Sequence, residues 1–318
     1  MRFNSRRFAA LAFSGLLPGL LLFSQDAVSQ QREDTLVYCA EASPQTFDPS
    51  SKFDGPMLSM VSLPIFDRLV DYEPGTTDIV PALAESWSVS DDGTAYTFDL
   101  RPDVRFHETE RFKPSRAMNP DDVVFSFRRQ LDETHPWYGE NEAGAYGPIA
   151  DMKGIIESID KVDDGTVRFQ LTEPHAPFIS NMAISLASIV SAEYADAVDA
   201  DGDRSRFIRE PVGTGPFRFE SYTPDVAVRY SANMDHWAGP PRSARLVAAI
   251  VKDQAVRTQK VESGECNIAP YPAPADIDRL ESADDVTVSE IAGLNFSFLA
   301  FNTQQPPFDD PEVRRAIA

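Results

Sequence analysis

Histidine and cysteine are scarce in this 318-residue sequence, and their scarcity excludes most metal and redox chemistry. There are 4 histidines and 2 cysteines, and no two of them have the spacing of zinc ligands. No G-x-S-x-G, G-x-x-x-x-G-K-[ST], G-x-G-x-x-G or H-E-x-x-H motif occurs. The acidic stretch "DADGDRSRFIRE" resembles a calcium loop but has Arg204 where that loop needs glycine. We therefore expect no enzyme, no metal site and no cofactor.

Basic residues are also few, with 29 Lys and Arg against 50 Asp and Glu and a net charge of −21. Such a surface repels nucleic acid and anionic lipid, so we expect neither as a partner. It could attract cationic ligands, although an acidic surface also serves solubility alone.

The only long apolar run lies at the N-terminus and is typical of an export signal. Three arginines precede "FAALAFSGLLPGLLLF" (8–23), and "AVS" (27–29) offers a small-x-small cleavage site. The alternative is a membrane anchor, for which sixteen residues interrupted by Pro18 are short. We expect residues 1–29 to be a cleaved signal peptide and the mature protein to lie in the periplasm.

Export gives the two cysteines an oxidising surrounding, in which an even count favours a disulfide. We therefore expect Cys39 and Cys266 to be bonded, with two buried free thiols as the alternative.

Alternating and helical patterns predict a mixed α/β chain. "SWSVS" and "AYTFDL" flank an Asp92-Gly93 turn, and "TVRFQL" follows a second Asp-Gly turn, so two hairpins are expected. Asn119 and Pro120 are typical of a helix start. Further strands are expected, in chain order, at "TLVYC", "PFRFESY", "VAVRYSA", "ARLVAAIV", "NIAPYP" and "VTVSEIAG".

Near the end of the chain, Gly293 separates two strand-like runs, a place where a chain can cross from one lobe to another. A helix then begins at Asp310 and Pro311 and stops after about two turns. We expect residues 293–318 to be this crossover and the start of a truncated second lobe.

Several ordered segments resemble the solute-binding proteins of peptide ABC importers, family 5 of the bacterial extracellular solute-binding proteins. They are "LVYCAEASPQTFDP", "PALAESWSVSDDGTAYTFDLRPDVRFHE", "FKPSRAMNPDDVVFSF", "EPVGTGPFRFESY", "SGECNIAPYPAPADI" and "LAFNTQQPPFDDPEVRRAIA". Within that family, the first and third segments and the cysteine pair resemble the dipeptide-binding and Sap-type branch. The resemblance implies a two-lobed α/β type 2 periplasmic-binding-protein fold. Residues 30–292 would be lobe I, with an inserted subdomain at roughly 73–208.

The resemblance also implies ligand contacts. Phe53, Asp54 and Gly55 occupy the loop that touches peptide in relatives, and Tyr146 is a further residue expected to line the pocket. Phe53 departs from the small polar residue expected there, and both aromatic residues could simply pack. Asp54 could pair with a cationic ligand or only cap the turn before Pro56. The charged anchors for a free dipeptide lie in the second lobe of relatives, so they have no counterpart here.

The function implied is capture of di- or oligopeptides, by a monomer, for an ABC permease in the inner membrane. Haem, a polyamine or a cationic antimicrobial peptide are alternative ligands, and a sensory or chaperone-like role without a transporter is an alternative function.

Overall fold

The computed structural model of the protein describes residues 34–140, 152–290 and 299–317. The expected signal peptide, Tyr146 and the crossover at Gly293 lie outside these residues. No helix in the described ranges combines the length and apolar character needed to cross a membrane.

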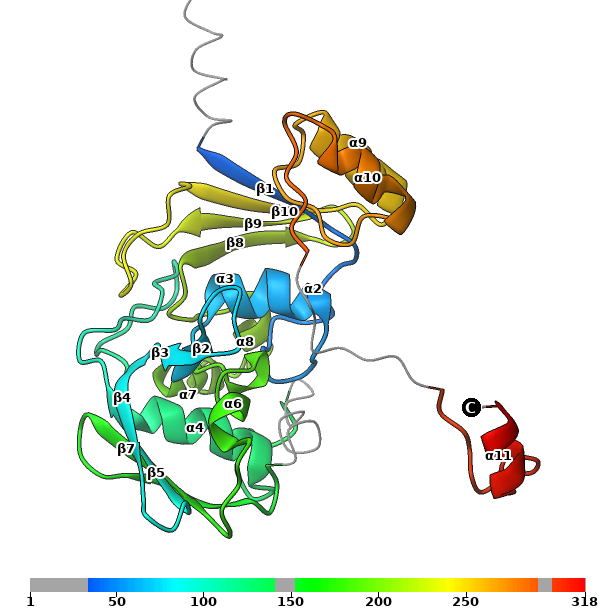
Figure 1. Ribbon diagram of the computed structural model, residues 1–318. Helices are drawn as coiled ribbons and strands as arrows, with labels where there is room; N and C mark the ends of the chain where they lie inside the picture. Colours follow the sequence, from blue (N-terminus) through cyan, green and yellow to red (C-terminus); the bar gives the residue numbers. More distant parts are fainter. Residues whose placement is uncertain (1–33, 141–151, 291–298, 318) are drawn as a thin grey trace, which may run out of the picture.

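The first of two four-stranded sheets contains the N-terminal strand and has the order β1-β10-β9-β8. β1 pairs in parallel with β10, and the other neighbours are antiparallel. Strands of this sheet appear at the top of Figure 1, with two helices beside β1. The strands and these helical elements are β1 (Thr35–Ala40), β8 (Phe217–Thr223), β9 (Ala227–Ala232), β10 (Arg245–Ile250), α9 (Gln254–Glu262), η4 (Pro274–Asp276) and α10 (Ile277–Glu281).

A continuous helical segment follows the loop after β1 and packs beneath this sheet (Figure 1). It begins at Gly55, passes through a π-helical turn and ends at Ile65. Its buried face carries Met57, Met60 and Val61, while Leu58 and Leu63 on the other face are exposed. Its parts are α2 (Gly55–Met57), η1 (Leu58–Ser62) and α3 (Leu63–Ile65).

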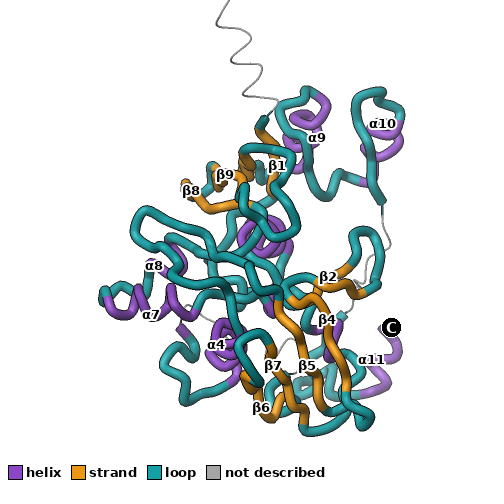
Figure 2. The backbone as a smooth tube through the Cα atoms, turned by 90° about the vertical axis from the view of Figure 1, so that its left-hand side faces the viewer, coloured by secondary structure: helices purple, strands orange, loops and turns teal. Residues whose placement is uncertain are grey.

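The second four-stranded sheet is wholly antiparallel, with the order β4-β5-β7-β6, and short helices accompany it. Figure 2 shows the two sheets at opposite ends of the molecule. Asn119 and Asp122 form a reciprocal capping box at the start of α4. The acidic residues in the first turn also interact favourably with the helix dipole. The chain between α3 and β8 contains the strands of this sheet together with two further strands and several helices. They are β2 (Val70–Tyr72), β3 (Ile79–Pro81), β4 (Ala84–Val89), β5 (Ala95–Leu100), α4 (Pro120–Leu131), β6 (Ile156–Lys161), β7 (Thr166–Leu171), α6 (Phe178–Asn181), η3 (Ser185–Ala187), α7 (Ala192–Ala200) and α8 (Arg206–Arg209).

One hydrophobic core runs through both sheets and the helices between them. It extends from Ala40 and Met57 near the first sheet to Phe98, Phe127 and Phe169 at the second. The three phenylalanines meet edge to face, with Phe127 and Phe169 centroids 5.0 Å apart. The two sheets are therefore parts of one packed body.

Both predicted hairpins and the helix at Asn119 are confirmed, but the predicted strand at "NIAPYP" is wrong. "NIAPYP" makes only an isolated bridge between Ile268 and Tyr38, because Pro270 and Pro272 lack the N–H that a ladder needs. Tyr271 between them has a positive φ of 55°, which also breaks an extended run. Val286–Glu290, the described part of "VTVSEIAG", forms no strand.

The final helix, α11 (Pro311–Ile317), lies apart from the rest of the described chain in Figure 1. Asp310 Oδ1 accepts a hydrogen bond from Glu312 N at 2.8 Å, as a residue at a helix start should.

Candidate functional site

The carboxyl end of β1 lies where three chain segments meet, and in open α/β sheets ligands bind at such ends. The segments are the residues that follow β1, the start of α2, and the loop of residues 266–272. We treat this junction, with the pocket beside it, as the candidate site.

The disulfide between Cys39 and Cys266 attaches the 266–272 loop to β1, with the two Cα atoms 5.9 Å apart. Cys39 N donates to Ile268 O at 2.8 Å, and Val37 N donates to the side-chain oxygen of Asn267 at 2.8 Å. These bonds hold the loop in place although it lies more than two hundred residues from β1 in sequence.

On the opposite side of the junction, Asp54 starts α2. Its Oδ1 accepts a hydrogen bond from Met57 N at 2.9 Å, so its carboxylate caps the helix, which is one of the two roles considered for it. Phe53, one residue earlier, leaves 52% of its surface exposed. Of the residues predicted to contact ligand, Phe53, Asp54 and Gly55 therefore lie together here, while Tyr146 lies outside the described residues.

Gly55 allows a close approach to Glu41, the first residue after β1. A Cβ atom at position 55 would lie 3.0 Å from Glu41 Oε1 and 3.6 Å from the Tyr271 hydroxyl. A side chain at this position would thus be tight against Glu41 and in ordinary contact with Tyr271. Gly55, Glu41 and Tyr271 form the centre of the junction.

Glu41 was missed by the sequence analysis, although its place directly after a predicted strand could have indicated it. Its Oε2 atom is buried and has no hydrogen-bond partner among the described residues. Burial raises the pKa of the neighbouring Tyr38 hydroxyl, and the negative charge of Glu41 acts in the same direction. The junction is therefore partly desolvated, and Glu41 and Arg257 act on the pKa of Tyr38 in opposite directions.

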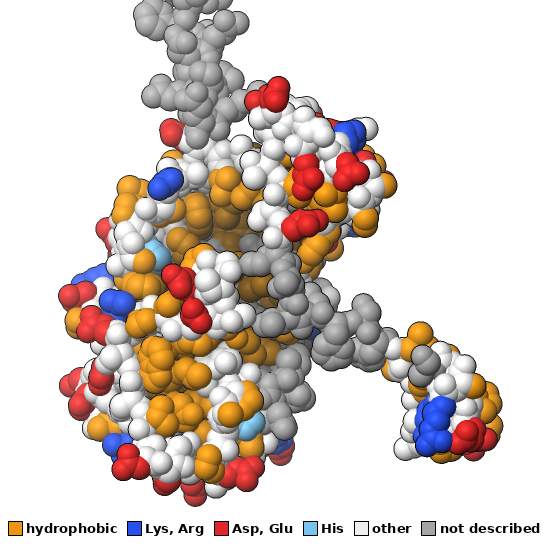
Figure 3. Space-filling model, in the orientation of Figure 1, with side chains coloured by type: hydrophobic (Ala, Val, Ile, Leu, Met, Phe, Trp, Pro, Cys, Tyr) orange, Lys and Arg blue, Asp and Glu red, His pale blue; other side chains and the backbone are white. Residues whose placement is uncertain are grey.

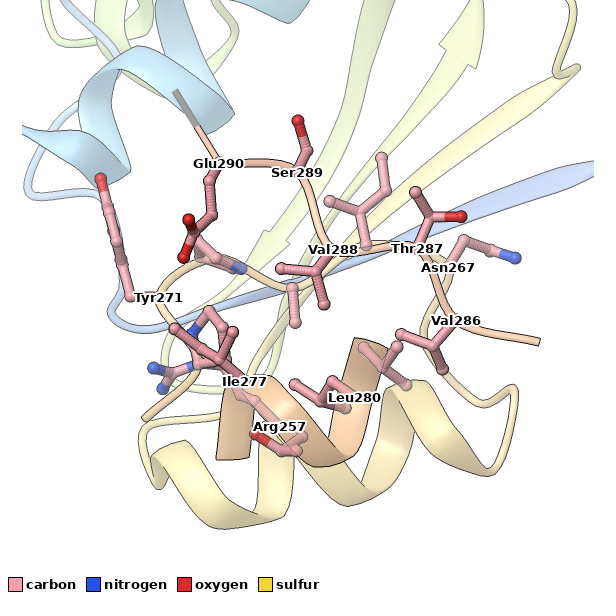
Figure 4. A pocket seen from close by; sticks show the side chains of 16 residues that line it. Arg257, Asn267, Tyr271, Ile277, Leu280, Val286, Thr287, Val288, Ser289 and Glu290 are labelled. Carbon is pink, nitrogen blue, oxygen red and sulfur yellow. The ribbon is translucent and has the colours of Figure 1, made fainter. Parts of the chain in front are cut away.

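Tyr271 extends into the junction from the disulfide-linked loop. The residue is 66% exposed, and Gln254 Nε2 donates to its backbone oxygen at 2.6 Å. Figure 4 shows its hydroxyl pointing toward the helical segment that begins at Gly55. Its left-handed backbone costs about 1 kcal/mol or more for a residue with a side chain, and such strain clusters at binding sites.

A pocket of about 1040 Å³ opens next to this junction. Tyr271 and Glu290 lie at the same end of it in Figure 4, and the space-filling view shows acidic side chains around its α9–α10 side (Figure 3). Most of its lining is apolar or small, as ligand pockets usually are. The lining includes Val261, Ile268, Pro270, Ile277, Leu280 and Val288.

The described residues contain no cluster of side chains suited to catalysis or to metal binding. No group of three or more His, Cys, Asp or Glu side chains there could hold a metal ion. His107 is buried far from solvent, and burial lowers its pKa to about 4. What the junction offers a ligand is shape, aromatic surface and a carboxylate.

Comparison with known proteins gives concordant matches. The model of "Bacterial extracellular solute-binding proteins, family 5 Middle" matches residues 78–318. Di/tripeptide-binding protein 2 of Pseudomonas aeruginosa is 45% identical over 311 residues, covering 98% of this chain and 58% of that protein. Heme-binding protein A of Haemophilus influenzae is 40% identical over 296 residues, covering 92% and 54%.

Among solved structures, a dipeptide binding protein from Pseudoalteromonas in complex with Met-Leu superposes with a TM-score of 0.85 at 36% identity. The match covers 89% of this chain and 56% of that one. This chain thus spans a little over half the length of the relatives that it matches.

Proposed function

Because the chain belongs to the family 5 bacterial extracellular solute-binding proteins, we propose that it captures small peptides outside the cytoplasm for import. The protein binds di- or tripeptides as a monomer and presents them to an ABC permease in the inner membrane. Residues 1–29 direct its export and are removed.

The observation that carries this proposal is the likeness to a receptor solved with a bound dipeptide. That likeness extends over nearly all of the described chain and is accompanied by 45% identity to a di/tripeptide-binding protein. The junction at the end of β1 supports it, since an exposed aromatic ring and a pocket suit binding without chemical change. The family consists of solute-binding proteins and not of enzymes.

The proposal includes a division of the chain. Residues 30–292 form lobe I of a type 2 periplasmic-binding-protein fold, with an inserted subdomain at roughly 73–208. Residues 293–318 form the crossover and the start of lobe II. Phe53, Asp54 and Gly55 at the junction, together with Tyr146 from the insertion, line the cleft between the lobes.

The test is calorimetric titration of the exported protein, produced from its complete reading frame, with Ala-Ala, Met-Leu, hemin and spermidine. Saturable binding of the dipeptides, with heat absent for hemin and spermidine, is the expected result. Hemin binding without dipeptide binding would replace peptide by haem as the ligand, an alternative motivated by the haem-binding relative.

A pair of variants locates the site. Phe53→Ser is expected to weaken dipeptide binding, because that side chain is 52% exposed beside the cleft. Val162→Ser is the matched control, since Val162 is 47% exposed but follows β6 at the far sheet. If both substitutions weaken dipeptide binding equally, or if neither changes it, Phe53 is excluded from the site.

A further inference from the structure

Glu41, at the centre of the junction, has a carboxylate oxygen that lacks a hydrogen-bond partner in the described residues. A buried carboxylate oxygen without a donor is energetically costly, and in most native structures such an atom has a partner. Glu41 Oε2 has none in the described residues. The Glu41 carboxylate lies within the junction, because a Cβ atom added at Gly55 would be only 3.0 Å from its Oε1 atom.

Two cationic side chains that follow β10 make other bonds, although the Nε atom of Arg257 is itself buried without a partner. Arg257 Nη1 donates to the backbone oxygens of Val251 and Lys252, at 2.9 and 3.0 Å. The Lys252 ammonium pairs with Asp225 at 2.8 Å. Neither forms an ion pair with Glu41 in the described part of the chain.

Tyr271 provides a second feature suited to a cation. Its hydroxyl lies within reach of Gly55, the residue is mostly exposed, and its backbone is held in a strained conformation by Gln254. The face of a tyrosine ring attracts ammonium groups, more strongly where water is excluded. The Glu41 carboxylate and the Tyr271 hydroxyl thus both lie beside Gly55, and Tyr271 also lines the pocket.

We propose that Glu41 and Tyr271 form a subsite for an alkylammonium group of the bound ligand. The ammonium donates to Glu41 and lies against the Tyr271 ring. This inference rests on the proposed function and adds to it a preference in lobe I for a positively charged group. That group comes either from a lysine side chain or from the amino terminus of the peptide.

The experiment compares Lys-Ala with Ala-Ala and with norleucyl-alanine, whose side chain has the same four carbons as lysine but lacks the ammonium group. Affinities are measured by calorimetry on the exported protein from its complete reading frame, for wild type and Glu41→Gln. If a lysine side chain is recognised, Glu41→Gln weakens Lys-Ala about tenfold, the loss expected for one charge-assisted hydrogen bond, and leaves the other two unchanged. If the amino terminus is recognised, all three weaken by a similar factor.

Both of these outcomes support the subsite, and affinities within about twofold of wild type for all three peptides overturn it. Glu157→Gln serves as the control, since Glu157 is an exposed acid on β6. If Glu41→Gln does not fold, Tyr271→Ala takes its place, because an exposed ring can be removed without opening the core. Unchanged affinities in that variant likewise overturn the inference. Failure of wild type to bind any of the three peptides would instead refute the proposed function itself.

Discussion

Replacing Arg129 by methionine is expected to destabilise the protein strongly, although Arg129 contacts no part of the candidate site. Its Nη1 and Nη2 atoms donate to the two carboxylate oxygens of Asp48, both at 2.7 Å, and Nη2 also reaches Ser50 Oγ at 2.8 Å. The two charged side chains are 1% and 0% exposed. This ion pair ties α4 to the loop that leads from β1 to α2, and so it holds the loop that carries Phe53.

The magnitude follows from what remains after the substitution. Asp48 keeps its hydrogen bonds from Ser50 but loses its counter-ion, and an uncompensated buried charge costs about 3–5 kcal/mol. Asp48→Asn should cost a similar amount, because it leaves the Arg129 guanidinium buried and unpaired. The double variant should lose less stability than the two single variants lose together, with a coupling free energy of about 2 kcal/mol or more.

The assay is urea unfolding followed by circular dichroism for wild type, both single variants and the double variant. Arg128→Met is a matched control on the same helix, because its ion pair with Asp132 is at 2.9 Å but exposed. An exposed pair of this spacing contributes only about 0.3–0.5 kcal/mol. Similar losses for Arg128→Met and Arg129→Met, or strictly additive single variants, would refute the reasoning.

Three further predictions concern other parts of the fold. Replacing Cys39 and Cys266 by serine should lower the free energy of unfolding by up to about 5 kcal/mol, because the disulfide spans 227 residues, and equal urea midpoints for the two proteins would contradict this. Gly215→Ala should lower the melting temperature sharply, since the new Cβ would lie 2.6 Å from the carbonyl carbon of Ile65, and a change under about 2 °C would contradict it. Burial depresses the pKa of His107 to about 4, so between about pH 6.5 and 4 the unfolded state binds a proton that the folded state does not. The free energy of unfolding should therefore fall by about 3 kcal/mol as the pH decreases through that window. An equally steep fall in the His107→Asn variant would show that His107 is not its source.

The elements that were predicted correctly are those whose signals are local. An Asp-Gly turn between alternating runs is sufficient to specify a hairpin, and Asn119 with Pro120 and Asp122 is sufficient to start α4. The segment "NIAPYP" failed because its apolar residues indicate a strand, whereas its two prolines deny the backbone bonds that a strand needs.

The candidate site was predicted only in part, for the same reason. Phe53 and Gly55 could be named because they lie in a loop that resembles the ligand loop of a known family. Glu41 and Tyr271 each lie in a segment that resembles the family, but they are separated by more than two hundred residues, and no sequence pattern indicates that they meet.

The hairpins and the helix caps thus follow from short stretches of residues, because each depends on neighbours in the chain. The meeting of Glu41, Gly55 and Tyr271 does not. It depends on the parallel pairing of β1 with β10, on the disulfide that attaches the 266–272 loop, and on the packing of α2 below the sheet. These are contacts between distant segments, and only the folded chain brings them to one place.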